Sequence, residues 1–255
     1  MLNFLSQDDA IRRAGLRIVL VQGLPSPWGQ AAKTLFEIKK LDYLAVPWLP
    51  GDPNQKLVDW SHADSAPIVA WNDEPPINRW LDILFLAERL APTPSLVPTD
   101  AHERALMLGL SHEICGELGI GWNRRLQMFA PMLDGDNPPA GMQLMGKKYR
   151  YNKDDAKQAG ERTAHQLRAL TAQLKYQQAR GVNYFVGDQL SALDIYWTAF
   201  SNLLDPLPKD KCPIPDDWRP MFPATDPQIK AALDPSLFAH RDRIFQQHFR
   251  SPMEF

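Results

Sequence analysis

The pattern of apolar and polar positions predicts a strand followed by a helix near the start of the chain. Leu16 to Val21 is an apolar run rich in β-branched residues that ends at a turn signal, Gly23, as a buried strand does. The helix that follows has one apolar side, formed by Ala31, Ala32, Leu35, Phe36 and Ile38. A polar lead-in precedes the strand, so we expect the core of this region to begin at about residue 16.

Two more strands and a helix complete this region. Residues 43–48 and 68–71 predict short strands, separated by a polar, proline-bearing connection over 49–64. Residues 78–90 predict a helix with apolar positions facing inward. Because parallel strands joined by a helix need a right-handed crossover and a covered sheet, we expect a small α/β domain of about 75 residues.

The rest of the chain has a helical pattern. The predicted helices are 102–129, as one long helix or two in series, 153–179, 191–204 and 235–249. Proline- and glycine-rich residues 131–146 and 205–227 separate them as irregular segments. We therefore expect an α/β domain over 1–90, a linker over 91–100 that contains three prolines, and an all-helical domain over 101–255.

Composition narrows the functional classes. The chain has 255 residues with a formal net charge of -2 and no basic run, which argues against binding to nucleic acid. Its two cysteines, Cys115 and Cys212, are far apart, so we expect neither a disulfide framework nor a metal site. No apolar stretch approaches the length of a membrane span, and the first residues lack the apolar region of a signal peptide. These features predict a cytoplasmic protein that does not enter membranes.

Two short motifs stand out. Ser191 and Asp194 have the spacing of a capping box, in which serine and acid satisfy free amides at a helix start, so we expect a structural role. A catalytic triad would need a histidine, and the sequence places none beside them. Pro67 follows Ala66 at the start of a strand, where proline is normally excluded, and this suggests a tight turn with a cis bond, or else an ordinary loop proline.

The order of these features resembles the cytosolic glutathione S-transferase superfamily over nearly the whole chain. The resemblance rests on the proline-led strand, on residues 85–90 that close the first domain, on the linker, and on residues 186–188 followed by Ser191 and Asp194 in the helical domain. It implies a thioredoxin-like N-terminal domain, a helical C-terminal domain, and a homodimer.

The resemblance implies that glutathione is the co-substrate and that its thiol must be activated. Ser26 lies in Pro25-Ser26-Pro27-Trp28, which looks like the serine-proline-aromatic stretch of the serine-type transferases, so its hydroxyl would face the sulfur. A helix N-cap is the alternative role for Ser26, because proline is common at the first helical position. Trp28 would line the cleft or pack the helix onto the sheet. Serine in place of cysteine argues against disulfide reductase activity.

Further contacts to glutathione are implied for residues on three other segments. The backbone of Ala66, beside Pro67, would pair with the peptide, and Gln55 and Lys56 would approach the glycyl carboxylate, with a solvated lysine as the alternative. The chain departs from the family where relatives have Glu-Ser for the γ-glutamyl group, because it has Asn78 and Arg79 there. Asn78 is a good N-cap, and a helix start with Arg79 still favours a carboxylate.

Trp122, Arg125 and Phe129 recur at helical spacing and would present a face to a second substrate, a small hydrophobic electrophile; core packing is the alternative for Trp122. The resemblance thus implies a transferase that conjugates glutathione to this electrophile. Two alternatives stay open: a non-catalytic binding module of the same fold, and a glutathione-dependent lyase or isomerase.

Overall fold

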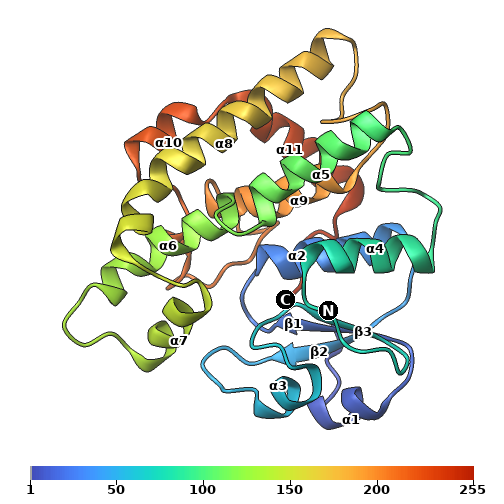
Figure 1. Ribbon diagram of the computed structural model, residues 1–255, viewed down its shortest axis with the longest axis vertical. Helices are drawn as coiled ribbons and strands as arrows, with labels where there is room; N and C mark the ends of the chain where they lie inside the picture. Colours follow the sequence, from blue (N-terminus) through green and yellow to red (C-terminus); the bar gives the residue numbers. More distant parts are fainter. Residues whose placement is uncertain (1) are drawn as a thin grey trace. The chain divides into compact units, whose positions relative to one another are not determined.

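A three-stranded sheet forms the centre of the first of two compact units in the computed structural model, which describes residues 2–255 (Figure 1). The strands are β1 (Leu16–Val21), β2 (Leu44–Trp48) and β3 (Ile68–Trp71), in the order β2-β1-β3. β1 is parallel to β2 and antiparallel to β3, with Val19 opposite Val46 and Ile68. The three strands confirm the sequence prediction, but the sheet is mixed rather than parallel throughout.

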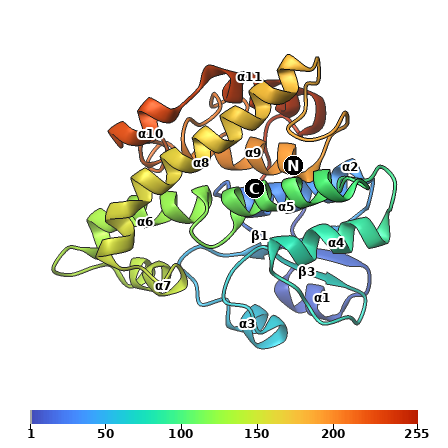
Figure 2. The ribbon, with the colours of Figure 1, turned by 45° about the horizontal axis from the view of Figure 1, so that its top comes forward.

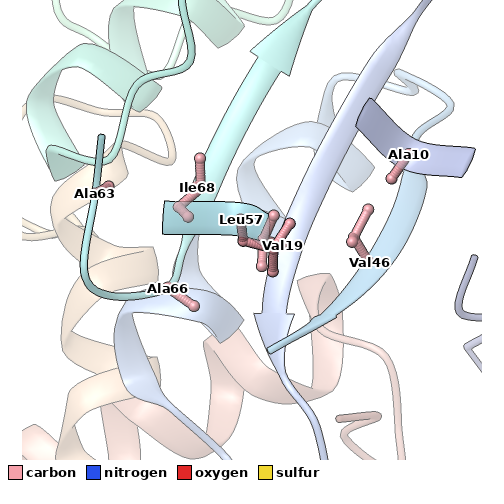
Figure 3. Packing of buried hydrophobic residues seen from close by; sticks show 7 residues of the cluster. All are labelled: Ala10, Val19, Val46, Leu57, Ala63, Ala66 and Ile68. Atoms are coloured by element: carbon pink, nitrogen blue, oxygen red, sulfur yellow. The ribbon is translucent and has the colours of Figure 1, made fainter. Parts of the chain in front are cut away.

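Four helices cover the two faces of this sheet. α2 (Pro27–Ile38) and α4 (Trp80–Leu90) lie on one face, and α1 (Gln7–Arg12) and α3 (Gln55–Ser61) lie on the other (Figure 1). A buried cluster fills the space between the sheet, α1 and α3, as Figure 3 shows; its members are Ala10, Val19, Val46, Leu57, Ala63, Ala66 and Ile68. The sequence predicted α2 and α4. It did not predict α3, which lies in the segment 49–64 that was expected to be a connection without regular structure.

The first unit also contains two later segments, 207–215 and 246–255. Near the end of the chain, the backbone carbonyl of Glu254 accepts hydrogen bonds from Gln30 Nε2 at 3.0 Å and from Lys33 Nζ at 2.9 Å, both on α2. The backbone amide of Met253 donates to the carbonyl of Lys211 at 2.8 Å. Distant parts of the sequence therefore complete this unit.

The second unit, residues 97–206 and 216–245, is helical. Its helices are α5 (Ala101–Cys115), α6 (Ile120–Leu133), α7 (Ala140–Lys148), α8 (Lys153–Ala179), α9 (Ala192–Phe200), α10 (Pro227–Ala232) and α11 (Pro235–His248), which runs on into the last segment of the first unit; 3-10 turns cover Ser201–Leu203 and Arg219–Met221. All residues of α9 are buried, so it is the core helix of this unit, with α5 beside it (Figure 2). In the described residues no helix is long and apolar enough to cross a membrane.

The predicted helices are present, but some bounds differ and two short helices were not predicted. α6 runs to Leu133, past the predicted end at 129, and α9 ends at Phe200 rather than at 204. α8 has the predicted bounds, and residues 102–129 form two helices in series, because the chain turns at 116–119 between α5 and α6. α7 lies in a segment that the sequence predicted as irregular, and α10 begins where the second irregular segment ends. Both are short helices that begin after or at a proline, where the propensity signal is weak.

Candidate functional site

Ser26 lies at the start of α2, just after the loop that leaves β1. Pro27 occupies the first helical position, and the backbone of Ser26 is extended, with φ of -64° and ψ of 119°. Its hydroxyl makes no cap bond to the helix, and within residues 2–255 it has no other hydrogen-bond partner. Proline with its fixed φ begins the helix without help from the side chain, so the hydroxyl stays available at the positive end of the helix dipole.

Ala66 and Pro67 form a turn directly before β3. The bond between them is cis, which confirms the prediction of a cis proline here. The methyl group of Ala66 packs in the cluster of Figure 3. Its backbone amide and carbonyl form no hydrogen bond with any described residue. An amide and a carbonyl at this turn are thus available to an extended peptide.

A surface pocket of about 560 Å³ lies beside this turn, within the first unit. It is lined by Val58, Asp59, His62, Ala63, Asp64 and Asn78. Asp59 accepts a hydrogen bond from Gln55 Nε2 at 2.7 Å, whereas Asp64 has no partner among the described residues. The pocket therefore combines a carboxamide with two carboxylates, a lining that suits a ligand bearing an ammonium group.

Three pocket residues, Asp59, His62 and Asp64, were missed by sequence reasoning. The only signal was the polar run over residues 61–65, which the sequence analysis treated as an approach to the strand. His62 ends α3 in the left-handed region, with φ of 55°, and this turn brings the loop beside Asn78. Such a turn depends on the packing of α3 and cannot be deduced from the residue types.

The other residues implied for glutathione are placed differently. Lys56 is exposed and pairs with Asp8 of α1 at 2.6 Å, so its ammonium faces that helix. Asn78 does not cap α4, which corrects the N-cap expectation: Arg79 occupies the N-cap position without a side-chain bond, and the helix begins at Trp80. The chain between β3 and α4 pairs with β3 through Ile77 and Val69, which holds Asn78 outside the helix.

Solved structures resemble this chain over most of its length. A glutathione S-transferase from Methylobacterium radiotolerans, in complex with glutathione sulfonate, is 14% identical, with 95% of this chain and 98% of that chain covered and a TM-score of 0.62. One from Methylobacillus flagellatus with glutathione bound is 14% identical over 91% of this chain and 95% of that one, with a TM-score of 0.62. A rice enzyme of this kind in complex with glutathione is 17% identical over 93% and 91%, with a TM-score of 0.60.

The fold is that of the glutathione S-transferases. This confirms the predicted architecture, a thioredoxin-like N-terminal region followed by a helical C-terminal region. No family model and no curated protein matches the sequence. At these identities the likeness concerns the fold, and the chemistry has to be argued from the residues of this chain.

Within this glutathione S-transferase fold, the residues implied for the second substrate share one face of α6. Trp122 and Phe129 both contact Tyr149 at the end of α7, with ring centroids 5.0 Å and 5.9 Å apart. The guanidinium carbon of Arg125 lies 5.9 Å from the ring centroids of both Phe129 and Phe222. Phe129 is buried and Trp122 half-buried, so packing against Tyr149 accounts for much of their surface.

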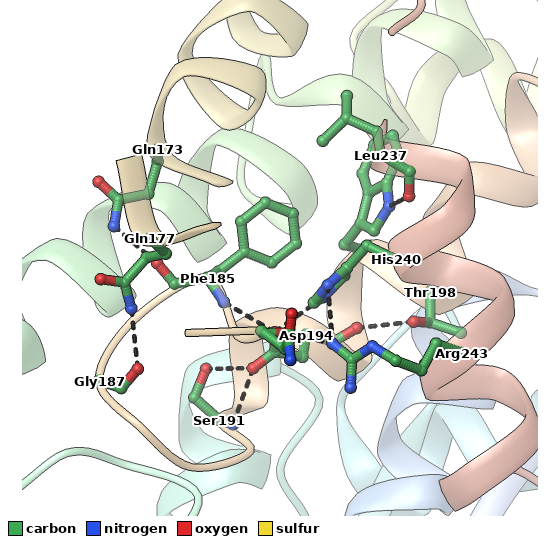
Figure 4. A network of polar contacts seen from close by, with 12 residues as sticks. Gln173, Gln177, Phe185, Gly187, Ser191, Asp194, Thr198, Leu237, His240 and Arg243 are labelled. Carbon is green, nitrogen blue, oxygen red and sulfur yellow. Dashed lines mark hydrogen bonds and ion pairs between the residues drawn. The ribbon is translucent and has the colours of Figure 1, made fainter. Parts of the chain in front are cut away.

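The capping box at α9 is present and is part of a larger network (Figure 4). Asp194 Oδ2 accepts from the amide and the hydroxyl of Ser191, each at 2.9 Å, and Oδ1 lies 2.9 Å from His240 Nε2. The expectation that no histidine stands beside these residues was wrong, because α11 brings His240 in from a distant part of the sequence. The network is still no triad: serine and histidine both bind the carboxylate, and all three residues are buried.

The protein's own thiols are unsuited to catalysis. Cys115 and Cys212 are both buried. Burial raises the pKa of the Cys115 thiol well above its ordinary value. Among residues 2–255, no group of three or more His, Cys, Asp and Glu side chains could hold a metal ion. Thiol chemistry at the site of Ser26 would therefore need a thiol brought by the ligand.

Proposed function

We propose that this protein is a glutathione transferase that conjugates the thiol of glutathione to a small hydrophobic electrophile. The observation that carries the proposal is the free hydroxyl of Ser26 at the N-terminus of α2. The fold supports it, as do the solved structures of this fold that hold glutathione or its sulfonate. The proposal includes a homodimer located in the cytoplasm.

Ser26 would act by stabilising the thiolate of glutathione. A free thiol with a pKa of about 8.5 is only partly ionised at neutral pH, and a hydroxyl donor together with a helix N-terminus lowers that pKa. The thiol proton passes to solvent, sulfur forms a bond to the electrophilic carbon, and the leaving group departs with its electron pair. In an addition reaction no group leaves: the π electron pair of the acceptor moves to the neighbouring atom, which then takes up a proton from solvent.

Ala66 and the neighbouring pocket would hold the rest of the tripeptide. The unpaired amide and carbonyl of Ala66 suit the backbone of the cysteinyl residue. The γ-glutamyl end would enter the pocket, with its ammonium group toward Asp64 and its carboxylate toward Asn78. Arg79, exposed beside Asn78, adds a positive charge for that carboxylate.

The test replaces Ser26 by alanine. We expect Ser26→Ala to lower kcat/KM for conjugation of 1-chloro-2,4-dinitrobenzene by about 10- to 100-fold, as for the loss of a hydrogen bond to a charged group. The ultraviolet absorbance of the bound thiolate at neutral pH should fall with it. Ser6→Ala is the matched control, because Ser6 caps α1 and belongs to no part of this site. Unchanged activity and thiolate absorbance in Ser26→Ala would show that the serine has no catalytic role.

A non-catalytic binding module is the second candidate, and the acidic lining of the pocket favours it. Asp59 and Asp64 would repel the carboxylates of glutathione, and the chain lacks the Glu-Ser pair of its relatives. Calorimetry separates the two candidates. Saturable heat of binding with millimolar glutathione and a rise in Tm support the transferase, whereas no heat and no shift favour the binding module.

A further inference from the structure

Within the helical unit, α6 and the end of α7 form a cluster of aromatic rings (Figure 1). Trp122 and Phe129 lie on one face of α6, and both contact the ring of Tyr149, the residue that ends α7. Phe129 and Tyr149 are buried, whereas Trp122 is only half-buried. Trp122 is therefore the ring of this cluster that a planar ligand can reach.

Two cations stand on this cluster without a counter-charge. The guanidinium carbon of Arg125 lies 5.9 Å from the ring centroids of Phe129 and Phe222, so two rings hold it in place. The Nζ atom of Lys148 lies 5.2 Å from the ring centroid of Tyr149. Both cations are half-buried, and neither forms an ion pair with any residue from 2 to 255. Their positive charges are thus available to an anion.

The hydrogen-bond donors of Arg125 are largely unused. A guanidinium carries five N–H donors, and among the described residues Arg125 makes one weak contact, from Nη1 to Met128 Sδ at 3.7 Å. The adjacent Arg124 is buried and bonds to the carbonyls of Leu203 and Phe222. Burial, and after it the charge of Arg125, lower the pKa of Arg124 to about 10. An anion bound at Arg125 would offset the repulsion between the two guanidinium groups.

Charge and ring contacts together restrict the ligand. An inorganic anion would leave the indole of Trp122 without a partner, and a neutral aromatic compound would leave both cations without a counter-charge. A guanidinium fork matches the two oxygens of a carboxylate and also stacks on aromatic planes. Trp122 and Arg125 are three residues apart, so they are neighbours on the surface of α6.

We propose that the face formed by Trp122, Arg125 and Lys148 binds an aromatic carboxylate. The electrophile that accepts glutathione therefore carries an acid group. This last assignment rests on the proposed function, whereas the binding itself rests on the residues of the helical unit.

The first test is calorimetric titration of the full chain, without glutathione, with 3,5-dinitrobenzoate and with its neutral analogue 3,5-dinitrobenzamide. We expect saturable binding of the benzoate and an affinity for the amide at least about tenfold weaker. Arg125→Gln should weaken benzoate binding by about tenfold. Lys148→Gln, which leaves α6 unaltered, should weaken it by about threefold. Arg168→Gln is the matched control, because Arg168 is an exposed arginine of α8 without a partner among the described residues.

Each of the following results would overturn the proposal: no saturation by the benzoate in the millimolar range, equal affinity for the amide, or equal effects of the two arginine variants.

The second test adds glutathione and compares 4-chloro-3,5-dinitrobenzoate with 4-chloro-3,5-dinitrobenzamide, each of which loses chloride to a thiolate. After division by the uncatalysed rates, kcat/KM should favour the acid by about tenfold, and Arg125→Gln should remove this preference through KM. Equal values for the two compounds would overturn recognition of the acid and support the transferase. Binding that selects the acid, without conjugation of either compound, would support the binding face and contradict the transferase.

Discussion

Asp194 shows how a single buried carboxylate can organise several segments. It accepts hydrogen bonds from the amide of Phe185, from the amide and hydroxyl of Ser191 and from His240 (Figure 4). Arg243 donates to His240 Nδ1 at 3.1 Å, so the proton of the neutral imidazole is on Nε2 and points at Asp194. The acid therefore joins the start of α9, the preceding loop and α11.

We expect Asp194→Asn to lower the free energy of unfolding by about 2–4 kcal/mol, because an amide group would face donors that now bind a carboxylate. Urea denaturation at pH 7 measures this. Asp188→Asn is the control on the same loop, where the side chain is exposed and has no partner among residues 2–255, and we expect it to change stability by less than about 0.5 kcal/mol. Equal effects of the two variants would contradict the role given to Asp194.

Asp234, just before α11, makes a pH-dependent contribution to the free energy of unfolding. Lys175, at 2.5 Å from Oδ2, and the hydroxyl and amide of Ser236 lower the pKa of this carboxyl to about 2. A group with a lowered pKa in the folded state stabilises it at pH values above its unfolded pKa of about 3.9, and this contribution disappears as the pH falls toward 2.

Accordingly, Asp234→Asn, which removes the negative charge that pairs with Lys175, should cost about 0.5–1 kcal/mol of stability at pH 7 and progressively less below pH 4. Urea titrations of both proteins between pH 7 and pH 3 would measure the difference. A cost that stays constant over this range would mean that the negative charge does not contribute.

At the residue scale, the sequence predicted some parts of the candidate site and not others. The cis proline and the serine before α2 could be predicted, because each depends on the local covalent properties of proline. The pocket beside them could not, since Asp64 and Asn78 approach each other only after the chain turns at His62. The position of His240 beside Asp194 likewise depends on how α11 packs.

At the scale of elements, prediction succeeded where the apolar period was long or the run was β-branched. β1, β3 and α8 have the predicted bounds for this reason. α3 was missed because it has only seven residues. Asn54 precedes it, but its side chain binds the backbone of Leu49 and does not cap the helix. The direction of β3 was also beyond prediction, because side-chain alternation is the same in parallel and antiparallel strands.

Gly160 allows a test of how α8 packs on α10. A Cβ at this position would lie 2.1 Å from Asp226 Oδ2, and Asp226 caps α10 through the amide of Gln228 at 2.8 Å. Gly160→Ala should therefore destabilise the protein by about 1–3 kcal/mol, although alanine is the better helix former.

Gly109 is the matched control in α5. A Cβ there meets nothing within 4 Å, so Gly109→Ala should stabilise the protein by about 0.5–1 kcal/mol. Thermal and urea unfolding of the two variants should give shifts of opposite sign. Stabilisation by both substitutions would show that α8 does not approach Asp226 as described.

At the scale of the whole molecule, the last residues of the chain complete the first unit. Lys33 is 1% exposed, and its ammonium donates to the carbonyl of Glu254. Burial lowers the pKa of Lys33, because desolvation disfavours the charged ammonium. No periodic signal marks these residues, and the contact spans 221 positions, so the sequence could not predict it.

Deletion of residues 252–255 removes this carbonyl acceptor. We expect a loss of about 2 kcal/mol in the free energy of unfolding, as for a hydrogen bond to a charged group, along with the buried surface of Met253. In a Lys33→Met background the same deletion should cost at least about 1 kcal/mol less, because no buried ammonium remains to lose its acceptor. An identical cost in both backgrounds would contradict the coupling between Lys33 and Glu254.

The contact between Lys33 and Glu254 also constrains the order of events during protein synthesis. Ribosomes add about 5–20 residues per second, so the acceptor of Lys33 emerges roughly 10–45 s after the lysine itself, given a separation of 221 residues. During that interval the nascent α/β unit carries a lysine whose native acceptor has not yet been translated. Stable closure of this unit is therefore expected only after residue 254 has left the ribosome, well after its three strands have done so.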